Sequence, residues 1–356
     1  MIEQLLKLYK FKRIKFFGYI LRKLYKSSRI IINIYSNIFI YKLINKNASN
    51  KLFIYDLRNN PPSFGDVIYF YHKFIFSDYK NKKIIFLINK SIPYLGDLRF
   101  NKVFNKSNYQ LRINQLYEVG KLLNINQNSI HLMDRNEFKN FLSVNNCHLI
   151  YPNYYNFFIG SFLSNNYVTS KDFINLKFLK TIKISEKYKF LRKDFFNIVI
   201  HIRHSNDNRE VERNSNLAIW NKVLSEFKNH KRIKFFIICD EQEYKYLKNK
   251  ILKYKNVHFT KDLNFSIKDD FSIVYYSDLY IGSNSGPSTI RFLSKKPYII
   301  CGLDLHDRSR YASTNFFINI DSHTQKFIFA KNNQIISKNW DFDLIKNFIY
   351  EFINDT

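Results

Sequence analysis

The hydrophobic residues of this chain follow two alternating periods from residue 51 onward. Between the later of its apolar runs, hydrophobic residues recur at helical spacing over 215–229, 241–254, 265–276 and 286–294. Apolar strands separated by helices are typical of parallel sheets that helices cover on both faces. The pattern therefore predicts an α/β fold. Its expected strands, rich in β-branched and aromatic residues, lie at 51–57, 82–88, 148–152, 196–202, 233–239, 257–260, 278–283 and 297–301.

A polar stretch over 170–190, for which the pattern predicts helix, interrupts this alternation. The strand and helix pattern restarts near residue 190, so we place a domain boundary at 185–193. Two Rossmann-like domains result, at 51–188 and 189–338. The last segment, 339–356, contains an amphipathic helix whose apolar residues share one face. We expect this helix to pack back across the junction between the domains.

Residues 1–50 differ in composition from the rest of the chain. They contain eleven Lys and Arg residues but a single acidic residue, Glu3. Apolar residues recur at spacings near three and four from Leu5 to Leu24, which predicts a basic amphipathic helix. The longest apolar stretch, 30–41, is interrupted by polar residues and is too short to cross a bilayer. The segment either lies on an anionic membrane surface or packs on the first domain with its basic face in solvent.

The composition of the chain gives it a large positive charge. The 356 residues include 57 Lys and Arg against 29 Asp and Glu, a net charge of +28, together with 36 Phe and 26 Tyr. The aromatic content excludes a wholly disordered protein, and the charge suggests nucleic acid or an anionic membrane as a partner. Lys, Asn, Ile, Phe and Tyr are enriched together, as an AT-rich genome favours, so part of the charge reflects codon usage. Three scattered cysteines predict reduced thiols and a cytosolic location.

The sequence GSNSGPST at 282–289 lies between a predicted strand and a predicted helix. Small residues let an oxyanion approach the backbone, and free N–H groups together with the helix dipole favour a phosphate. The alternative is a well-capped helix without a ligand, and the turn is neither a Walker A loop nor a dinucleotide-binding fingerprint. The candidate phosphate ligands are Ser283, Asn284, Ser285, Gly286, Ser288 and Thr289.

The sequence HIRHSND at 201–207 follows another predicted buried strand. Arg203, at the carboxyl end of a strand, can hold a diphosphate through two parallel hydrogen bonds, and Arg213 can reach the same anion. His201 shares a face with Arg203 and either donates to a phosphate or leaving-group oxygen or makes a structural hydrogen bond. Asp207 joins the predicted substrate-binding set. His201 and His204 have no acidic or cysteine companion at ligand spacing, so we expect no metal there.

Gly65 and Asp66 lie in PPSFGD, directly before a predicted helix of the first domain. The Asp66 carboxylate either caps that helix or faces the phosphate site across a cleft between the domains. In the second case it can act as a general base on an acceptor hydroxyl, and Gly65 lies against the substrate. Asp207 and Glu210 are the other candidates for the base, ranked after Asp66.

These motifs together resemble those of GT-B-fold glycosyltransferases, which have two Rossmann-like domains. HIRHSND is similar to the H-x-R motif of fucosyltransferase-type enzymes, in which the arginine holds the diphosphate of a sugar nucleotide; that role falls here on Arg203. The SFGD turn is similar to that of heptosyltransferase-like enzymes, in which the aspartate is taken as the base. The stretch at 277–297 resembles the late turn whose small residues meet the donor nucleotide.

The resemblance implies a metal-independent glycosyltransferase without a cofactor, which moves a sugar from a nucleotide-sugar donor to a hydroxyl of a glycan or lipid-linked acceptor. Such transfer serves surface polysaccharide or lipopolysaccharide synthesis, and a helix N-terminus and basic side chains stabilise the leaving diphosphate. The D-x-D motif occurs once, at 341–343, where capping of the terminal helix accounts for it. The basic N-terminus would hold the enzyme peripherally at the inner face of the cell membrane.

Three alternatives belong to other classes. A nucleic-acid-binding protein fits the charge, but the chain contains no RNP, zinc-finger or helix-turn-helix signature and its aromatic residues lie mostly at predicted core positions. We therefore expect no nucleic-acid partner. A sugar-nucleotide epimerase would share the fold and the donor site. A catalytically inactive membrane scaffold would share the basic N-terminus.

Overall fold

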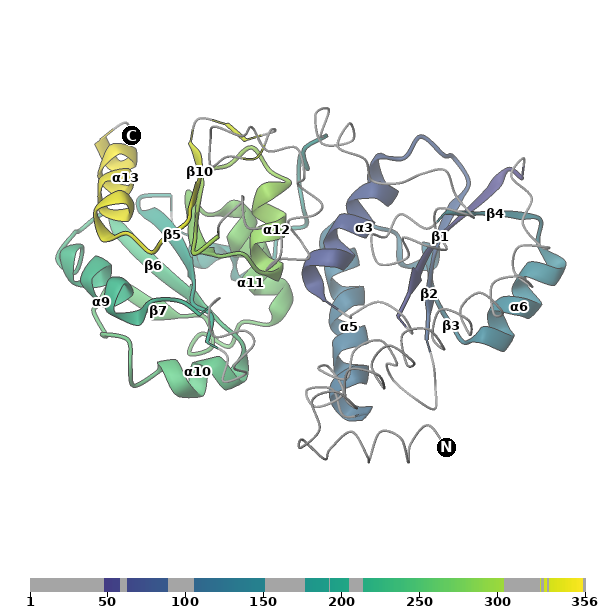
Figure 1. Cartoon of the computed structure of the whole chain (residues 1–356), viewed down its shortest axis with the longest axis horizontal. Coiled ribbons are helices and arrows are strands. Elements are labelled where there is room, and N and C mark those ends of the chain that lie inside the picture. The colour runs from purple at the N-terminus through teal and green to yellow at the C-terminus, as the bar shows by residue number, and fades with distance from the viewer. Residues whose placement is uncertain are drawn as a thin grey trace, which may run out of the picture.

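The computed structural model describes residues 48–57, 63–88, 106–150, 177–191, 193–204, 214–303, 327, 330, 331 and 333–354. The helix predicted near the N-terminus lies outside these ranges, as do Asp207, Glu210 and Arg213. The described elements form two α/β domains side by side along the longest axis of the molecule (Figure 1). None of the described helices is long and apolar enough to cross a membrane.

The first domain is built on a parallel sheet of four strands. Its elements are β1 (Asn50–Asp56), α3 (Phe64–Phe76), β2 (Lys82–Leu87), α5 (Lys106–Leu122), the short 3₁₀ helix η1 (Gln127–Ser129), β3 (Ile130–Met133), α6 (Arg135–Val144) and β4 (Cys147–Ile150). The strand order is β3-β2-β1-β4. Alternate side chains of a strand point to opposite faces. Phe53 and Tyr55 of β1 therefore lie in the core with α3 and α5, and Leu52 and Ile54 in the core with α6.

The second domain contains a larger parallel sheet of six strands. Its elements are η3 (Glu186–Phe190), β5 (Phe196–His201), α9 (Leu217–Glu226), β6 (Ile233–Ile238), α10 (Glu241–Leu247), β7 (Val257–Phe259), α11 (Ile267–Tyr276), β8 (Leu279–Ser283), α12 (Gly286–Phe292), β9 (Tyr298–Cys301), β10 (Gln334–Ser337) and α13 (Phe342–Asn354). The order β10-β9-β8-β5-β6-β7 is that of a doubly wound Rossmann sheet. Val199 and Tyr280 face α11 and α12, whereas Ile200 and Ile281 face α9 and α13.

The structure confirms the predicted α/β fold with two Rossmann-like domains. Each of the eight predicted strands is present, with its ends shifted by at most two residues. The four-residue strands β3 and β10 were not predicted. The helix predicted over 241–254 corresponds to α10, which ends at Leu247. Beyond it, the Asn221 side chain of α9 bonds the backbone at Lys250 and Leu252, so these residues form a turn instead.

Two further predictions differ from the structure. In the described part of 170–190, only η3 is helical, because the preceding backbone bonds to neighbouring elements: the Leu179 N–H donates to the Leu293 carbonyl at 2.8 Å. The terminal helix α13 packs against α9 of its own domain and, among the described residues, does not bridge the junction. Its apolar residues Ile345 and Ile349 are buried in one hydrophobic cluster with Trp220 of α9. The apolar face of α13 is therefore covered within the second domain.

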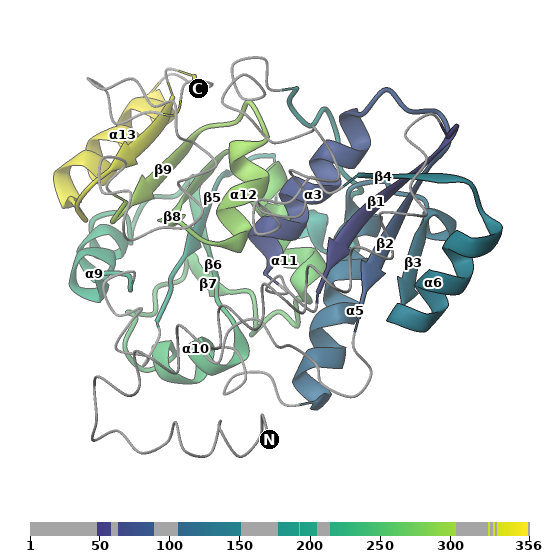
Figure 2. The ribbon, with the colours of Figure 1, turned by 45° about the vertical axis from the view of Figure 1, so that its right-hand side comes forward.

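The domains meet where the first turn of α3 packs on the first turn of α12 (Figure 2). A Cβ atom on Gly286 would lie 2.8 Å from the Cβ of Phe64, and one on Gly65 would lie 3.2 Å from Oγ1 of Thr289. The Phe64 ring also packs edge-on against Phe271 of α11, with centroids 5.3 Å apart. The absence of side chains at the two glycines therefore lets turns from the two domains touch.

Candidate functional site

The carboxyl ends of β5 and β8 lie side by side at the centre of the second sheet, where His201 is paired with Gly282. The strand order reverses at this point, because the chain runs outward from β5 to β6 and β7 and then returns to β8 on the other side. Ligands of doubly wound sheets bind in the crevice at such a switch point. The structure thus brings together His201 and the turn at 283–289, which the sequence placed in one site.

The turn between β8 and α12 is held by its own hydroxyl groups. The Ser285 N–H donates to Oγ of Ser288 at 3.0 Å, and the Ser288 hydroxyl donates to the Ser285 carbonyl at 2.6 Å. Ser288 and Thr289 are buried, so their side chains support the turn. Ser285 and Gly286 are partly exposed and are the members of the turn that a ligand can reach.

The start of this turn is buried as well. Ser283 and Asn284 are 3% and 8% exposed. The Ser283 hydroxyl has no hydrogen-bond partner among the described residues. A buried hydroxyl without a partner lowers stability and is uncommon in folded proteins. A ligand bound at the end of this strand could therefore form a hydrogen bond with the Ser283 hydroxyl, which has no partner among the described residues.

His201 is fixed by the same turn. Its Nδ1 lies 3.0 Å from Oγ of Ser285, and the side chain is 7% exposed. A Cβ atom on Gly282 would lie 2.9 Å from the His201 Cβ and from the Tyr280 hydroxyl, so glycine makes room for both rings. Burial raises the pKa of Tyr280, whose hydroxyl faces Ser285. Tyr280, which the sequence analysis did not single out because it falls inside a strand, thus belongs to the site.

Arg203 and His204 follow β5 and are held through their backbones. The Arg203 N–H donates to the Ser215 hydroxyl at 3.0 Å, and the Ser215 N–H donates to the Arg203 carbonyl at 2.9 Å. These bonds join the two ends of the segment that contains Asp207 and Arg213 in the sequence. The His204 ring stacks on Tyr246 with centroids 3.7 Å apart. Arg203 therefore lies just after the carboxyl end of β5, which is the predicted position, beside the switch point.

Glu243 of α10 is a second site residue that the sequence analysis missed. Its Oε1 accepts the His204 N–H at 3.0 Å, and its Oε2 accepts the Asp240 N–H at 2.8 Å. Burial raises the pKa of Glu243 to about 7, and the nearby Asp240 charge acts in the same direction, while the hydrogen bonds and the Arg203 charge lower it. The capping-box pattern of Asp240 and Glu243 accounts for this carboxylate as a helix cap, so no pattern in the sequence indicates its contact with the His204 backbone.

Asp66 lies in the first turn of α3, at the contact between the domains. Its N–H donates to the Ser63 hydroxyl at 3.3 Å, and the same hydroxyl donates to the carboxylate. Burial raises the pKa of Asp66 to about 6, although the Ser63 hydrogen bond opposes the shift. The structure shows the first of the two roles considered for this residue, because Asp66 joins the cap of α3. Its turn also touches the turn of α12. A carboxyl group that titrates near neutrality is suited to proton transfer.

Arg112 of α5 is a cation of the first domain beside this contact. Its guanidinium carbon lies 4.2 Å from the ring centroid of Phe64. Burial lowers the pKa of Arg112 to about 10, and the Asp240 carboxylate of the second domain opposes that shift. No sequence pattern distinguishes Arg112 from the other basic residues of the chain; only the packing of α5 against α11 places it at the junction.

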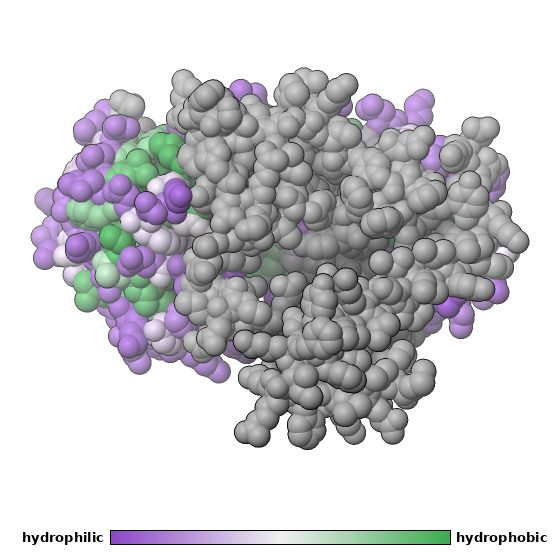
Figure 3. Space-filling model, in the orientation of Figure 1, coloured by the Kyte–Doolittle hydropathy of each residue, from purple (hydrophilic) through white to green (hydrophobic). Residues whose placement is uncertain are grey.

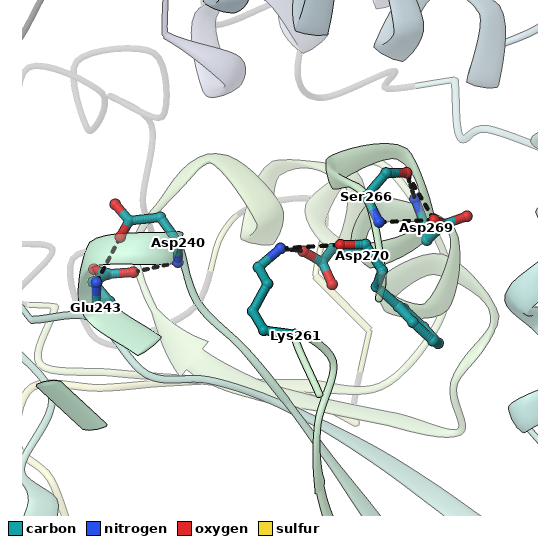
Figure 4. A network of polar contacts seen from close by, with 7 residues as sticks. Asp240, Glu243, Lys261, Ser266, Asp269 and Asp270 are labelled. Atoms are coloured by element: carbon teal, nitrogen blue, oxygen red, sulfur yellow. Dashed lines mark hydrogen bonds and ion pairs between the residues drawn. The ribbon is translucent and has the colours of Figure 1, made fainter. Parts of the chain in front are cut away.

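A neighbouring polar network lies at the start of α11 in the second domain. Figure 4 shows Lys261 extended toward Asp270, while Ser266 and Asp269 cap α11. The Lys261 Nζ lies 2.9 Å from Asp270 Oδ2, and the two side chains are 10% and 4% exposed. Burial raises the pKa of Asp270 to about 6, against the opposing effect of Lys261. A buried pair of this kind fixes the start of α11, which in turn packs against Phe64.

The described residues contain no group of three or more His, Cys, Asp or Glu side chains that could hold a metal ion. The two carboxylates of the D-x-D motif have structural partners. The Asp341 Oδ1 accepts the Leu344 N–H at 3.0 Å, and Asp343 pairs with Lys346 at 2.9 Å. Both carboxylates thus serve the start of α13, as the sequence analysis expected.

No protein-family model and no curated protein sequence matches this chain. Solved structures with a similar arrangement include the Escherichia coli heptosyltransferase WaaC with ADP, which is 11% identical, with 85% of this chain and 99% of that chain covered and a TM-score of 0.42. A glycosyl transferase of family 9 from Veillonella parvula is 12% identical, with 86% and 92% covered and a TM-score of 0.43.

A UDP-GlcNAc 2-epimerase from Neisseria meningitidis, bound to UDP-GlcNAc, is also similar: 10% identity, 86% of this chain and 91% of that chain covered, and a TM-score of 0.38. These matches include heptosyltransferases, the class that the motifs resemble, and also epimerases. At such identities the likeness concerns the arrangement of the two domains, and the argument for a function rests on the residues of the site.

Proposed function

We propose that this protein is a metal-independent glycosyltransferase. It would move a sugar from a nucleoside-diphosphate sugar onto a hydroxyl of a glycan or lipid-linked acceptor, in the synthesis of surface polysaccharide or lipopolysaccharide. The observation that supports this most directly is the contact between the Gly65–Asp66 turn and the turn that starts α12. It brings a carboxyl group with a pKa of about 6 to a turn suited to an anion. A transferase that releases a diphosphate needs both groups in one site.

The donor diphosphate would bind at the switch point of the second sheet. The backbone N–H group of Gly286 can donate to its oxygens, because this residue is partly exposed and starts a helix. His201, held by Ser285, and Arg203 provide further donors beside the turn. Arg213 and Asp207 complete the donor site from the loop in this proposal. Such fixed donors stabilise the negative charge that develops on the leaving diphosphate.

The acceptor hydroxyl would be activated from the first domain by Asp66. With a pKa of about 6, this carboxyl group is mostly ionised at neutral pH and can accept the proton as the bond between the sugar and the diphosphate breaks. Ser63 holds the carboxylate in place through its hydroxyl. Closure of the domains at the contact of α3 with α12 would exclude water and limit hydrolysis of the donor.

Nucleotide binding by the whole chain tests the donor site. Thermal shifts are measured with GDP, UDP, ADP and CMP for the unmodified protein, Arg203→Ala and the control Arg232→Ala, whose exposed side chain lies at the opposite end of the sheet. One nucleotide should stabilise the unmodified protein and the control but not Arg203→Ala. The proposal fails if no nucleotide has an effect and the protein binds RNA tightly instead. Release of nucleotide only in the presence of an acceptor distinguishes a transferase from an epimerase.

Membrane attachment is a separate part of the proposal. Residues 1–50, with eleven basic residues and one acidic residue, would lie as an amphipathic helix on the anionic inner face of the cell membrane, where lipid-linked acceptors are made. Sedimentation with anionic vesicles before and after deletion of residues 1–48 tests this placement. Equal sedimentation of the two forms would reject it.

A further inference from the structure

The end of α10 and the turn that follows it form a strongly basic surface. We define the α10–β7 surface as residues 245–255. It contains no Asp or Glu. Each of its lysines is exposed, and none forms an ion pair with a described carboxylate. Lys248 interacts with Tyr244 and with the charge of Asp262, and the charge of the other four lysines is available to a partner. The lysines are Lys245, Lys248, Lys250, Lys253 and Lys255.

Large hydrophobic side chains are exposed on the same surface. Tyr246 is 40% exposed and Leu252 is 44% exposed. They are two of the six large hydrophobic side chains that are exposed among the described residues. On the described part of the second domain, Figure 3 shows hydrophobic residues (green) interspersed among hydrophilic ones (purple), on the side where Figure 1 places α9 and α10. Lysines around exposed Tyr and Leu are typical of segments that lie at a membrane interface.

The exposed position of Leu252 is fixed by the fold. The Asn221 amide donates to the Lys250 carbonyl at 2.9 Å, and its oxygen accepts the Leu252 N–H at 2.9 Å. The adjacent Ile251 is 4% exposed and anchors the turn in the core with Leu247. Leu252 therefore cannot turn inward without breaking these contacts. The surface is preorganised, so little ordering is required when a partner binds.

We propose that the α10–β7 surface docks the second domain onto an anionic lipid bilayer. Lysine ammonium groups are point charges that match the diffuse charge of lipid headgroups, whereas Leu252 and the edge of Tyr246 would enter the interface. Single-stranded nucleic acid would instead need open aromatic faces for stacking, and one face of Tyr246 is covered by His204 at a centroid distance of 3.7 Å.

The docking surface adjoins the site of the proposed function. Tyr246 stacks on His204, and Glu243, one turn earlier in α10, binds the His204 backbone next to Arg203. This inference rests on the membrane attachment proposed for residues 1–50 and adds a contact from the folded domain. Stable attachment to a membrane commonly requires two signals, and a basic surface with hydrophobic side chains supplies the second.

The test uses the full chain and compares two charge-matched variants. Lys245→Glu/Lys253→Glu/Lys255→Glu alters the proposed surface. Lys180→Glu/Lys183→Glu/Lys189→Glu changes the same number of exposed lysines in the connection between the domains. Binding is measured to vesicles of phosphatidylcholine alone and of phosphatidylcholine with phosphatidylglycerol, without any sugar nucleotide. Thermal melting verifies that each variant is folded.

We expect binding only to the anionic vesicles, with a loss of at least about tenfold in the first variant and less than about twofold in the control. Leu252→Ser should weaken binding about threefold without altering the net charge. Equal losses in the two triple variants would overturn the docking surface and leave the attachment of residues 1–50 intact. No binding by the unmodified chain would refute both proposals. RNA binding that the first variant alone abolishes would assign the surface to nucleic acid instead.

Discussion

The turn that starts α3 and the turn that starts α12 each follow a parallel strand of their own domain, and they differ in what they offer a ligand. Each contains a glycine, a serine at the helix cap and a close contact with the other turn. In the first turn, burial of a carboxyl group raises the pKa of Asp66 to about 6. In the second, the described residues 283–289 include no acidic or basic side chain, and hydroxyl and N–H groups predominate.

The first turn is therefore suited to accept a proton, and the second is suited to bind an anion. Burial makes the Asp66 carboxylate a stronger proton acceptor. The turn at α12, with His201 and Arg203 beside it, favours negative charge. Because the turns touch, the proposed mechanism assigns acceptance of the proton to the first turn and release of the diphosphate to the second.

Asp66→Asn should lower the rate of sugar transfer by about 10²–10⁴-fold, because the amide cannot accept the proton. Since burial disfavours the Asp66 carboxylate, as its raised pKa shows, the neutral amide should leave the protein folded and donor binding unchanged. Transferred sugar is measured at saturating donor. The control is Asp78→Asn, at an exposed carboxylate of the same domain that pairs with Lys177. Comparable losses in the two variants would contradict a special role for Asp66.

Gly286→Ala should separate the two turns. The added Cβ would lie 2.8 Å from the Cβ of Phe64, so the helices must move apart. We expect activity to fall by about 10–100-fold through misplacement of Asp66, with stability lowered by about 1–3 kcal/mol. Gly65→Ala is the graded control, since its Cβ would meet only the Thr289 hydroxyl at 3.2 Å. A larger effect at Gly65 than at Gly286 would contradict the contact described.

Arg203→Ala should weaken donor binding by about tenfold or more, because a charge-assisted hydrogen bond to the diphosphate is lost. Arg203→Lys should recover part of the affinity, since it retains the charge but not the paired geometry. Dissociation constants for the nucleoside diphosphate, measured by calorimetry, provide the comparison. The same variants should leave the pH dependence of transfer unaltered. A shift of that profile in Arg203→Ala would mean that the two turns do not act separately.

The pH dependence of transfer should reflect the titration of the Asp66 carboxyl group in the first turn. Below its pKa of about 6 the Asp66 carboxyl group is protonated, so the rate should fall about tenfold for each pH unit below 6 and level off above 7. Removal of the hydroxyl in Ser63→Ala should shift the profile to higher pH, because the Ser63 hydrogen bond lowers the Asp66 pKa. A pH-rate profile of the two proteins measures the shift. No shift, or one to lower pH, would be inconsistent with Asp66 as the base.

Much of the fold could be predicted from the sequence because it depends on local pattern. Long apolar runs identified the central strands of both sheets, whereas β3 and β10, which lie at the edges of their sheets, were not distinguished by the pattern. The position of α13 could not be predicted, since an amphipathic face does not specify its partner; Trp220 and α9 supply it.

Part of the candidate site could be predicted from the sequence for the same reason. His201, Arg203, Asp66 and the 283–289 turn follow strands, where ligands of parallel sheets bind. Tyr280, Glu243 and Arg112 were missed, because each resembles an ordinary core, cap or surface residue in sequence. Their place in the site follows from packing: Gly282 makes room for Tyr280, and α5 brings Arg112 against Phe64.

A crystal structure of the full chain with a nucleoside diphosphate tests the central claim most directly, since it locates the anion relative to both turns. The diphosphate is expected within hydrogen-bond distance of the Gly286 N–H group and the Arg203 guanidinium, with the Asp66 carboxylate facing it from the first domain. A nucleotide bound elsewhere, or one at this turn with Asp66 directed away from the site, would contradict the central claim.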